Sequence, residues 1–397
     1  MLIILIPLTI TLCWGGGLLI NKGILRLRNF ILLLCLLSIW LVVYSAIVNK
    51  SSRGLYALLN VLVYSCVMFS IKTKSLVLFY IFFEFSIIPI TLIVFLYGYQ
   101  PEKLQAASSL LLYTVVRSLP LLLYILNGNI TLFTSSFLTI PITLSFLIKT
   151  PIYFFHTWLP KAHVEAPVGG SMVLAGVLLK LGSYGLLLFL PHVKMNLLLS
   201  FYFGISLVGP IIRSLICLRQ GDLKMLIAYS SVVHMSVVTL GFISGRELGQ
   251  TCGLIIVIGH GLRSPILFAF TFFLYEDSHS RLIVNNKNNC PIIVSGLIGL
   301  VSLNIGVPPR LRLWAEVLMS ISVIEFIRWA LPTLLFIFFI GAAYNLYMYT
   351  SCAHSKFNIC RNSINIKQLT ATWQTVFFGY RSFLCLDIFH LYWVTFP

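Results

Sequence analysis

The chain has 397 residues, of which 59% are hydrophobic and only 9% are charged. A soluble protein of this length needs far more polar surface, so the composition excludes a soluble globular fold. The formal net charge of +17 would suggest nucleic-acid binding in a soluble protein, but most basic residues here fall in short loops, as is usual beside membrane helices. We therefore expect a polytopic membrane protein whose partner is the lipid bilayer and not nucleic acid.

Apolar runs of about 20 residues, the length that a helix needs to cross a bilayer, recur along the chain. Lipid offers no hydrogen-bond partners, so the backbone of each run must pair within itself, which predicts helices. The expected fold class is all-α, a bundle of about thirteen transmembrane spans. In chain order the predicted spans cover residues 2–20, 30–48, 55–70, 75–97, 107–126, 132–156, 168–190, 197–218, 225–243, 251–275, 291–323, 329–350 and 373–396.

Two of the predicted spans contain residues that break helices. The span at 132–156 is expected to break at Pro141 and Pro151, and the span at 291–323 at the Gly-Val-Pro-Pro sequence of residues 306–309. Proline lacks a backbone donor and clashes with the preceding turn. Paired broken helices in two halves of a chain are typical of inverted-repeat transporters, whose site lies near the middle of the membrane.

Three ionisable residues fall within apolar runs. Glu84 and Lys180 lie near the centres of their spans, and Lys149 lies two residues before Pro151. A charge at this depth costs roughly 2.5–3.5 kcal/mol on insertion scales, so it usually has a function or a partner. Two alternatives need no transport role: Glu84 could be protonated and hydrogen-bonded to a neighbour, and Lys149 could extend to the membrane interface. We favour a proton or ion path.

Histidines and one further acid extend this set. His234 and His260 fall in successive spans and could relay protons, although a buried histidine is often only a packed core residue. Glu316 follows the second break and could end the path, or it could simply pair with Arg312 one helical turn earlier. The nine cysteines are scattered without a Cys-x-x-Cys pair, so no metal centre, iron–sulfur cluster or disulfide framework is predicted.

A carboxylate beside a buried lysine would control how firmly that lysine holds its proton. At about 4 Å and an effective dielectric constant near 20, one charge pair contributes about 4 kcal/mol. Moving one charge against 100 mV requires about 2.3 kcal/mol. Moving such a carboxylate away from the lysine therefore changes the energy by enough to load a proton on the lysine or to release it.

Five motifs carry a resemblance to a known family. The stretch at 156–185, HTWLPKAHVEAPVGGSMVLAGVLLKLGSYG, is accompanied in order by FFEFSIIP before it and by RQGDLKMLIAYSSVVHMS, GHGLRSPILF and GVPPRLRLWAEV after it. Together they closely resemble the chain 4 family of mitochondrial NADH:ubiquinone oxidoreductase, an antiporter-like membrane subunit of respiratory complex I. The resemblance covers about residues 79–349.

The resemblance implies a multi-pass protein of the mitochondrial inner membrane, with two inverted repeats, other complex I membrane subunits as partners and protons as cargo. It implies N-terminal helices at 1–74, a translocating core at 75–350 and a C-terminal loop and helix at 351–397. NADH, FMN, iron–sulfur clusters and ubiquinone would act in other subunits, so this chain would belong to the enzyme without doing redox chemistry or binding a cofactor or metal. The implied proton-path residues are Glu84, Lys149, Lys180, His234, His260 and Glu316, and the resemblance implies that Glu84 pairs with Lys149.

Two other functions remain open from the sequence. A stand-alone multisubunit cation/proton antiporter would share the lysines and the fold, and the proteins that copurify with the chain would distinguish it. A membrane scaffold that transports nothing would not need Glu84 and Lys180 at mid-span.

The sequence departs from the family pattern in two ways. Glu84 lies earlier in the chain, which suggests one N-terminal helix fewer. Arginines also stand where the family has small or polar residues, at Arg117, Arg263, Arg310 and Arg312. Arginine at bilayer depth needs a partner, and acids are scarce. One hypothesis is that some of these codons are reassigned in this mitochondrion, which would inflate the charge of +17.

The intact mass of the isolated subunit tests the codon hypothesis. The hypothesis requires a mass that differs from that of the printed sequence, because each reassigned position would carry another residue. A mass that fits arginine at every such position removes the hypothesis.

Overall fold

A computed structural model describes residues 54–73, 75–126, 136–190, 197–286, 291–307 and 311–353, with isolated positions between 34 and 45. The predicted spans at 2–20 and 373–396, and most of the span at 30–48, lie outside these residues. The described part is helical apart from turns and one isolated bridge between Asp222 and Leu282.

The helices follow the apolar runs in order, and some runs are divided. They are α3 (Gly54–Lys72), α4 (Leu76–Phe85), α5 (Ile87–Tyr97), α6 (Lys103–Leu111), the π-helical turn η1 (Leu112–Val116), α7 (Arg117–Leu126), α8 (Ser136–Lys149), α9 (Trp158–Glu165), α10 (Val168–Val173), the π-helical turn η3 (Leu174–Leu178), α11 (Leu179–Phe189), α12 (Leu197–Leu218), α13 (Leu223–Ile243), α14 (Glu247–Ser278), the short 3-10 helix η5 (Ile283–Asn285), α15 (Pro291–Ile305), α16 (Leu311–Phe326) and α17 (Ala330–Ala353).

Eight of the described helical segments are long and apolar enough to cross a membrane, by length and composition. Large apolar side chains are exposed on the outer helices, including Leu123 and Phe339. An apolar exterior of this kind is suited to lipid and unsuited to water. The chain is therefore a multi-pass, helical membrane protein.

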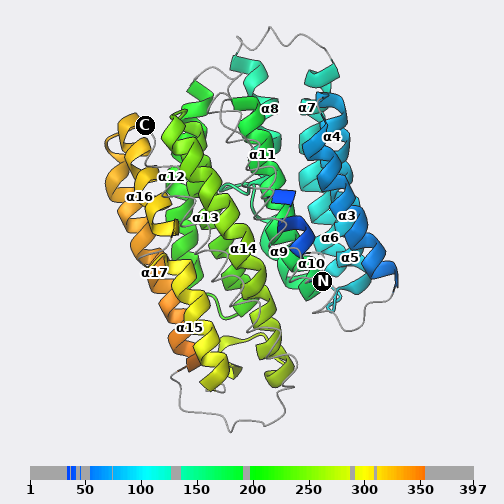
Figure 1. Ribbon diagram of the computed structural model, residues 1–397, viewed down its shortest axis with the longest axis vertical. Coiled ribbons are helices and arrows are strands. Elements are labelled where there is room, and N and C mark those ends of the chain that lie inside the picture. Colours follow the sequence, from blue (N-terminus) through cyan, green and yellow to red (C-terminus); the bar gives the residue numbers. More distant parts are fainter. Residues whose placement is uncertain are drawn as a thin grey trace, which may run out of the picture.

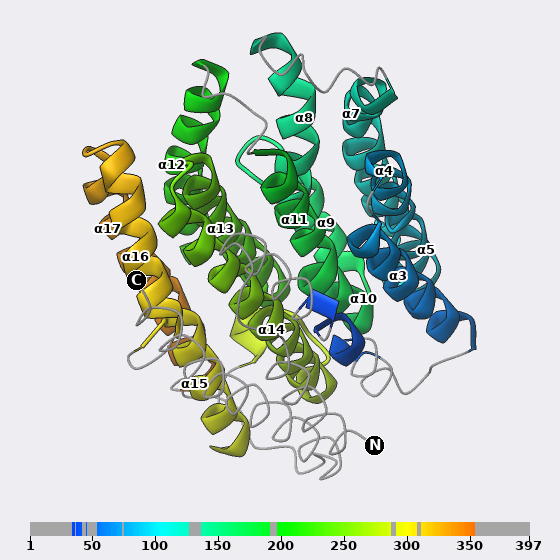
Figure 2. The ribbon, with the colours of Figure 1, turned by 45° about the horizontal axis from the view of Figure 1, so that its top comes forward.

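The helices form a bundle in which the middle of the chain is innermost. Figure 1 shows α3 to α7 on one side, α15 to α17 on the other, and α8 to α14 between them, and Figure 2 shows the same order. In the span formed by α10 to α11 and in α13, 94% of the most apolar stretch is buried inside the bundle. In α17 the corresponding share is 33%. The groups that need shielding from lipid are therefore expected on α10, α11, α13 and α14.

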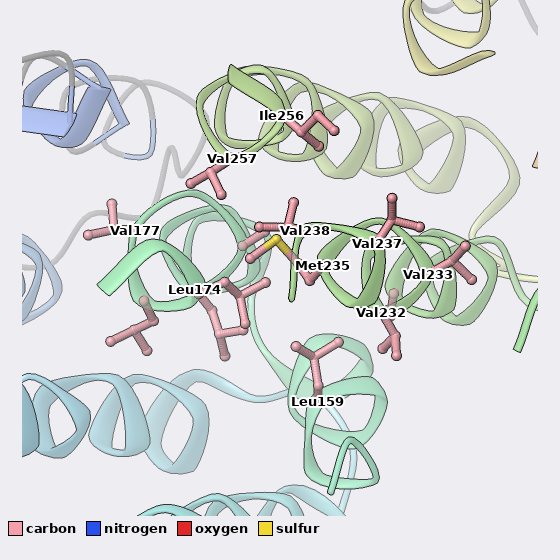
Figure 3. Packing of buried hydrophobic residues seen from close by; sticks show 14 of the residues in the cluster. Leu159, Leu174, Val177, Val232, Val233, Met235, Val237, Val238, Ile256 and Val257 are labelled. Atoms are coloured by element: carbon pink, nitrogen blue, oxygen red, sulfur yellow. The ribbon is translucent and has the colours of Figure 1, made fainter. Parts of the chain in front are cut away.

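Branched aliphatic side chains fill the space around α13. Figure 3 shows Val232 of α13 on the side of Leu159 of α9, and Val238 of α13 on the side of Leu174 of η3 and Val257 of α14. These residues belong to one continuous cluster of buried hydrophobic residues. Such close packing fixes the positions of any polar side chains that project from the same helices.

The expected break at Pro141 is wrong, because α8 continues through this proline. α7, α12 and α14 likewise continue through Pro120, Pro210 and Pro265. A proline removes one backbone hydrogen bond, and transmembrane helices tolerate that loss when neighbouring helices pack around the site. Proline alone is therefore a poor marker of helix ends in this chain.

Helix α8 ends two residues before Pro151, and α9 begins only at Trp158. The backbone between them includes Phe154 with φ +73°, a left-handed conformation that interrupts a helix. At the second expected break, α15 ends at Ile305 and is followed by Gly306 with φ +79°. Residues 308–310, which include both prolines of that motif, lie outside the described residues.

Helices α8 and α11 approach closely where Gly182 faces the end of α8. A Cβ atom on Gly182 would lie 2.9 Å from the Cβ of Lys149 and 3.0 Å from the Cγ2 of Thr150. These separations are shorter than a normal carbon–carbon contact. Because Gly182 has no side chain, the end of α8 at Lys149 can pack directly against α11.

We expect Gly182→Ala to lower the stability of the chain by about 1–3 kcal/mol, because the added methyl group overpacks this contact. Gly204→Ala in α12 is the matched control, since a Cβ there meets nothing within 4 Å and alanine favours the helix by about 1 kcal/mol. The thermal midpoint of each variant in detergent-solubilised membranes measures the effect. A midpoint for Gly182→Ala at or above that of Gly204→Ala would contradict the close contact.

Candidate functional site

Glu84 and Lys149 form a buried ion pair between α4 and α8. The Lys149 Nζ lies 3.1 Å from the Glu84 Oε1, and the lysine side chain is 4% exposed. Lys149 also donates a 2.9 Å hydrogen bond to the carbonyl oxygen of Phe83, and its Nζ lies 3.0 Å from the centre of the Phe83 ring. The ammonium group thus exchanges water for a carboxylate, a carbonyl and an aromatic face.

The pair exists because two helices end at the same place. Glu84 is the penultimate residue of α4, which gives way to α5 at Ser86, and Lys149 is the last residue of α8. Both oxygens of Glu84 are without a hydrogen-bond partner among the described residues. The ion pair is therefore the main electrostatic support of this carboxylate within the described structure.

Lys180 is buried in the centre of the bundle and is compensated differently. Its Nζ donates a 2.5 Å hydrogen bond to the carbonyl oxygen of Ala175, five residues earlier, and lies 2.8 Å from the Nδ1 of His260. Ala175 belongs to the π-helical turn η3, whose wider hydrogen-bonding pattern changes which carbonyls are available. Gly261 leaves room for the lysine stem, because a Cβ there would lie 3.1 Å from the Lys180 Cε.

The two histidines continue from Lys180 toward α16. The rings of His234 on α13 and His260 on α14 have centroids 6.0 Å apart in an edge-to-face arrangement. Both residues are buried. Successive helices therefore bring the two imidazoles together, as the relay hypothesis requires.

Arg312 connects His234 to Glu316. Its Nη2 lies 2.9 Å from the Nδ1 of His234, and its Nε donates a 2.5 Å hydrogen bond to the Glu316 Oε1. Its Nη1 donates to the Oδ1 of Asn304 at 3.0 Å. Because arginine only donates, the His234 Nδ1 accepts, and a neutral His234 carries its proton on Nε2. The hydroxyl oxygen of Tyr344 is 3.5 Å from that atom.

The residues predicted from the sequence therefore fall into two groups. Glu84 and Lys149 form the first, and the second runs from Lys180 through the histidines to Glu316. The groups meet where Lys149 packs against Gly182, two residues after Lys180. A row of buried polar groups through an apolar core, most of which can take up and release a proton, is typical of proton pathways.

Sequence reasoning missed three members of the second group. Asn304, Tyr344 and Asn345 all lie in apolar helices, and Asn304 donates a 2.8 Å hydrogen bond to the Oδ1 of Asn345. An asparagine inside an apolar run was the available signal. The suggested pairing of Glu316 with Arg312 is present, but the contact of Arg312 with His234 joins residues 78 positions apart and could not be seen in the sequence.

The fold and the buried groups agree with a class of membrane transport proteins. Residues 73–344 match the family described as NADH:quinone oxidoreductase/Mrp antiporter, TM. Within that class the relatives are more specific. NADH-ubiquinone oxidoreductase chain 4 of Ceratitis capitata is 39% identical over 350 residues, which cover 81% of this chain and 78% of the relative. NADH-ubiquinone oxidoreductase chain 4 of Mytilus edulis is 42% identical over 311 residues, which cover 72% of this chain and 70% of the relative. The chain belongs to the NADH-ubiquinone oxidoreductase chain 4 family.

Solved structures share the fold. A chain of respiratory complex I from Thermus thermophilus with bound NADH superimposes with a TM-score of 0.80 at 22% identity, covering 93% of this chain and 82% of that chain. A chain of the Mrp complex from Dietzia sp. gives a TM-score of 0.75 at 18% identity, covering 88% of this chain and 42% of that chain. At these identities the likeness establishes the antiporter-like fold alone.

Proposed function

We propose that this chain is a proton-translocating membrane subunit of respiratory complex I, which couples electron transfer from NADH to ubiquinone with proton movement across the mitochondrial inner membrane. Its membership of the chain 4 family supports the assignment to that enzyme. The observation that carries the transport function is the buried polar row from Lys180 to Glu316. Side chains of this kind are rare inside membrane helices unless they serve transport.

In this proposal the proton path uses Glu84, Lys149, Lys180, His234, His260 and Glu316. Glu84 controls the proton on Lys149, because one charge pair near 4 Å contributes about 4 kcal/mol at an effective dielectric constant of 20. Lys180 exchanges a proton with His260, whose Nδ1 it contacts directly. His234 and Glu316 pass the proton toward the far side, with Arg312 holding both in place.

The finer architecture is part of the same proposal. We take α8 and α9 as two halves of one interrupted span, and α15 and α16 as the halves of another, within two inverted repeats and about thirteen spans in total. The end of α8 at Lys149 and the positive φ of Phe154 and Gly306 support this interpretation. The core would comprise residues 75–350, with helices at 1–74 and a loop and helix at 351–397 beside it.

The redox reaction itself would take place in other subunits. NADH, FMN, iron–sulfur clusters and ubiquinone would bind there, and this chain would bind lipid, protons and neighbouring membrane subunits. The structural neighbours are chains of multi-subunit membrane complexes, which supports such partners.

A multisubunit cation/proton antiporter is the second candidate, because the Mrp chain shares the fold. The names of the sequence relatives favour complex I. The proteins that copurify after mild detergent extraction distinguish the two. Subunits of NADH dehydrogenase support the first proposal, and antiporter subunits without them support the second.

Lys180→Met is the direct test of proton transport. Methionine keeps an unbranched, mostly apolar side chain but cannot carry a proton, so we expect an assembled complex that has lost most of its NADH-driven proton pumping. Pumping is measured in inner-membrane vesicles together with the amount of intact complex. Normal pumping would refute the proposal, and failure to assemble would make Lys180 a structural residue.

Glu84→Gln and Glu84→Asp test the ion pair with Lys149. Glutamine keeps the shape but removes the charge that stabilises the lysine, whereas aspartate keeps the charge on a shorter side chain. We expect Glu84→Gln to lower the pumping rate more than Glu84→Asp. Equal, near-normal rates in the two variants would show that the charge of Glu84 has no part in transport.

A further inference from the structure

One face of α14 leads from Lys180 to the end of the bundle. His260, which contacts Lys180, is followed at helical spacing by Ser264, Phe268 and Phe272. At 1.5 Å per residue, the distance along the helix from His260 to Tyr275 is about 22 Å. This face is therefore long enough to connect the buried lysine with the surface of the protein.

A small cavity lies at the far end of this face. Phe272 and Tyr275 line it, together with Tyr99, Val168, Lys224 and Arg281. Arg281 is only partly buried. The backbone N–H of Leu223 donates to the carbonyl oxygen of Arg281 at 3.1 Å, which fixes the arginine beside the start of α13. The cavity thus lies where helix ends and connecting turns meet.

Titratable groups surround the cavity. Lys224 is buried and donates a 3.3 Å hydrogen bond to the carbonyl oxygen of Ala166. Glu165, which lies between the candidate spans, is 3% exposed. Burial raises the pKa of its carboxyl, although Arg281 acts to lower it. Glu102, exposed at the start of α6, also acts to raise that pKa. A carboxyl with a raised pKa, next to basic groups, can take up a proton from the surface.

His163 packs on α14 at Phe268, which lies along the helix between His260, the contact of Lys180, and Tyr275, which lines the cavity. It is fully buried, and its ring stacks on Phe268 of α14 with centroids 4.6 Å apart and planes 12° apart. Burial lowers the pKa of its imidazole, and the charges of Lys224 and Lys180 lower it further. Neither ring nitrogen has a hydrogen-bond partner among the described residues.

A buried imidazole with both nitrogens unpartnered calls for an explanation, because nearly all buried polar groups in proteins are paired with protein or ordered water. If His163 served only to pack against Phe268, a phenyl ring would suit the position better and would leave no polar atom unsatisfied. A relay through water uses both nitrogens, one to accept a proton and the other to release one.

We propose that His163 is a proton-relay residue that connects an access route at Lys224, Glu165 and Arg281 with Lys180. This inference rests on the proposed function. One ring nitrogen accepts a proton from water on the cavity side while the other releases its proton toward Lys180, so the ring gains no net charge. Rotation of the ring does not move a proton between its two nitrogens, so the starting tautomer returns when the protonated nitrogen gives its proton to water and the other nitrogen takes one up. The route supplies the second group of the proton path without passing through Glu84 and Lys149.

Two substitutions separate relay from packing. His163→Phe keeps the ring and its stack on Phe268 but removes both nitrogens, and His163→Gln keeps polarity without the ability to pass a proton. Relay by a positioned side chain contributes typically about 10²–10⁴-fold to a proton-transfer step. We expect both variants to assemble and to pump at least fivefold more slowly than the unaltered complex. Lys180→Met serves as the reference, and His279→Asn, an exposed histidine at the end of α14, serves as the control.

A third variant gives a readout that a structural role would not affect. His163→Ala leaves a space for free imidazole, and we expect added imidazole to raise its pumping rate at least twofold without affecting Lys180→Met. Normal pumping by assembled His163→Phe, or failure of all three His163 variants to assemble, would overturn the proposal. If Lys180→Met pumped normally as well, the proposed function itself would fail. Loss in Lys180→Met alone would leave that function intact and refute only the relay.

Discussion

Lys149 and Lys180 are buried almost completely and therefore lose nearly all of their hydration. The arrangement of the middle helices depends on the groups that replace this water. An ammonium group taken from water into a low-dielectric interior loses several kcal/mol of solvation, which hydrogen bonds and charges must offset. For Lys149, the carboxylate of Glu84 and the carbonyl group and ring of Phe83 offset the lost solvation. That requires α4 and α8 to end side by side, and Gly182 allows α11 to close over the contact.

Lys180 has no carboxylate among the contacts described above and relies on neutral acceptors. The carbonyl of Ala175 and the imidazole of His260 each take one proton position of the ammonium group. A carboxylate holds a lysine in its charged form, whereas an imidazole can accept the proton and release it again. The first lysine is therefore suited to holding charge and the second to exchanging it. The difference lies in their partners, since the two residues are chemically the same.

Much of the fold follows from the sequence, because apolar runs of bilayer length must be helical and are easily recognised. The order of the described helices and the positions of Glu84, Lys149 and Lys180 within apolar helices were predictable in this way. The pairing of Glu84 with Lys149 came from the family resemblance and not from spacing. Helix ends were less predictable, since α8 passes through Pro141 and stops before Pro151. The contact of Arg312 with His234 depends on tertiary packing, which a single sequence does not reveal.

The π-helical turns set the angular phase of the segments that follow them. Each residue of an α-helix advances the chain by about 100°, so one extra residue in a turn rotates everything downstream by that angle. Lys180 follows η3 by two residues, and its direction toward His260 depends on that rotation. Arg117 stands directly after η1, the other such turn among the described residues. A chain shortened by one residue within 174–178 would keep its span and its apolar packing length, yet its central lysine would face a different helix.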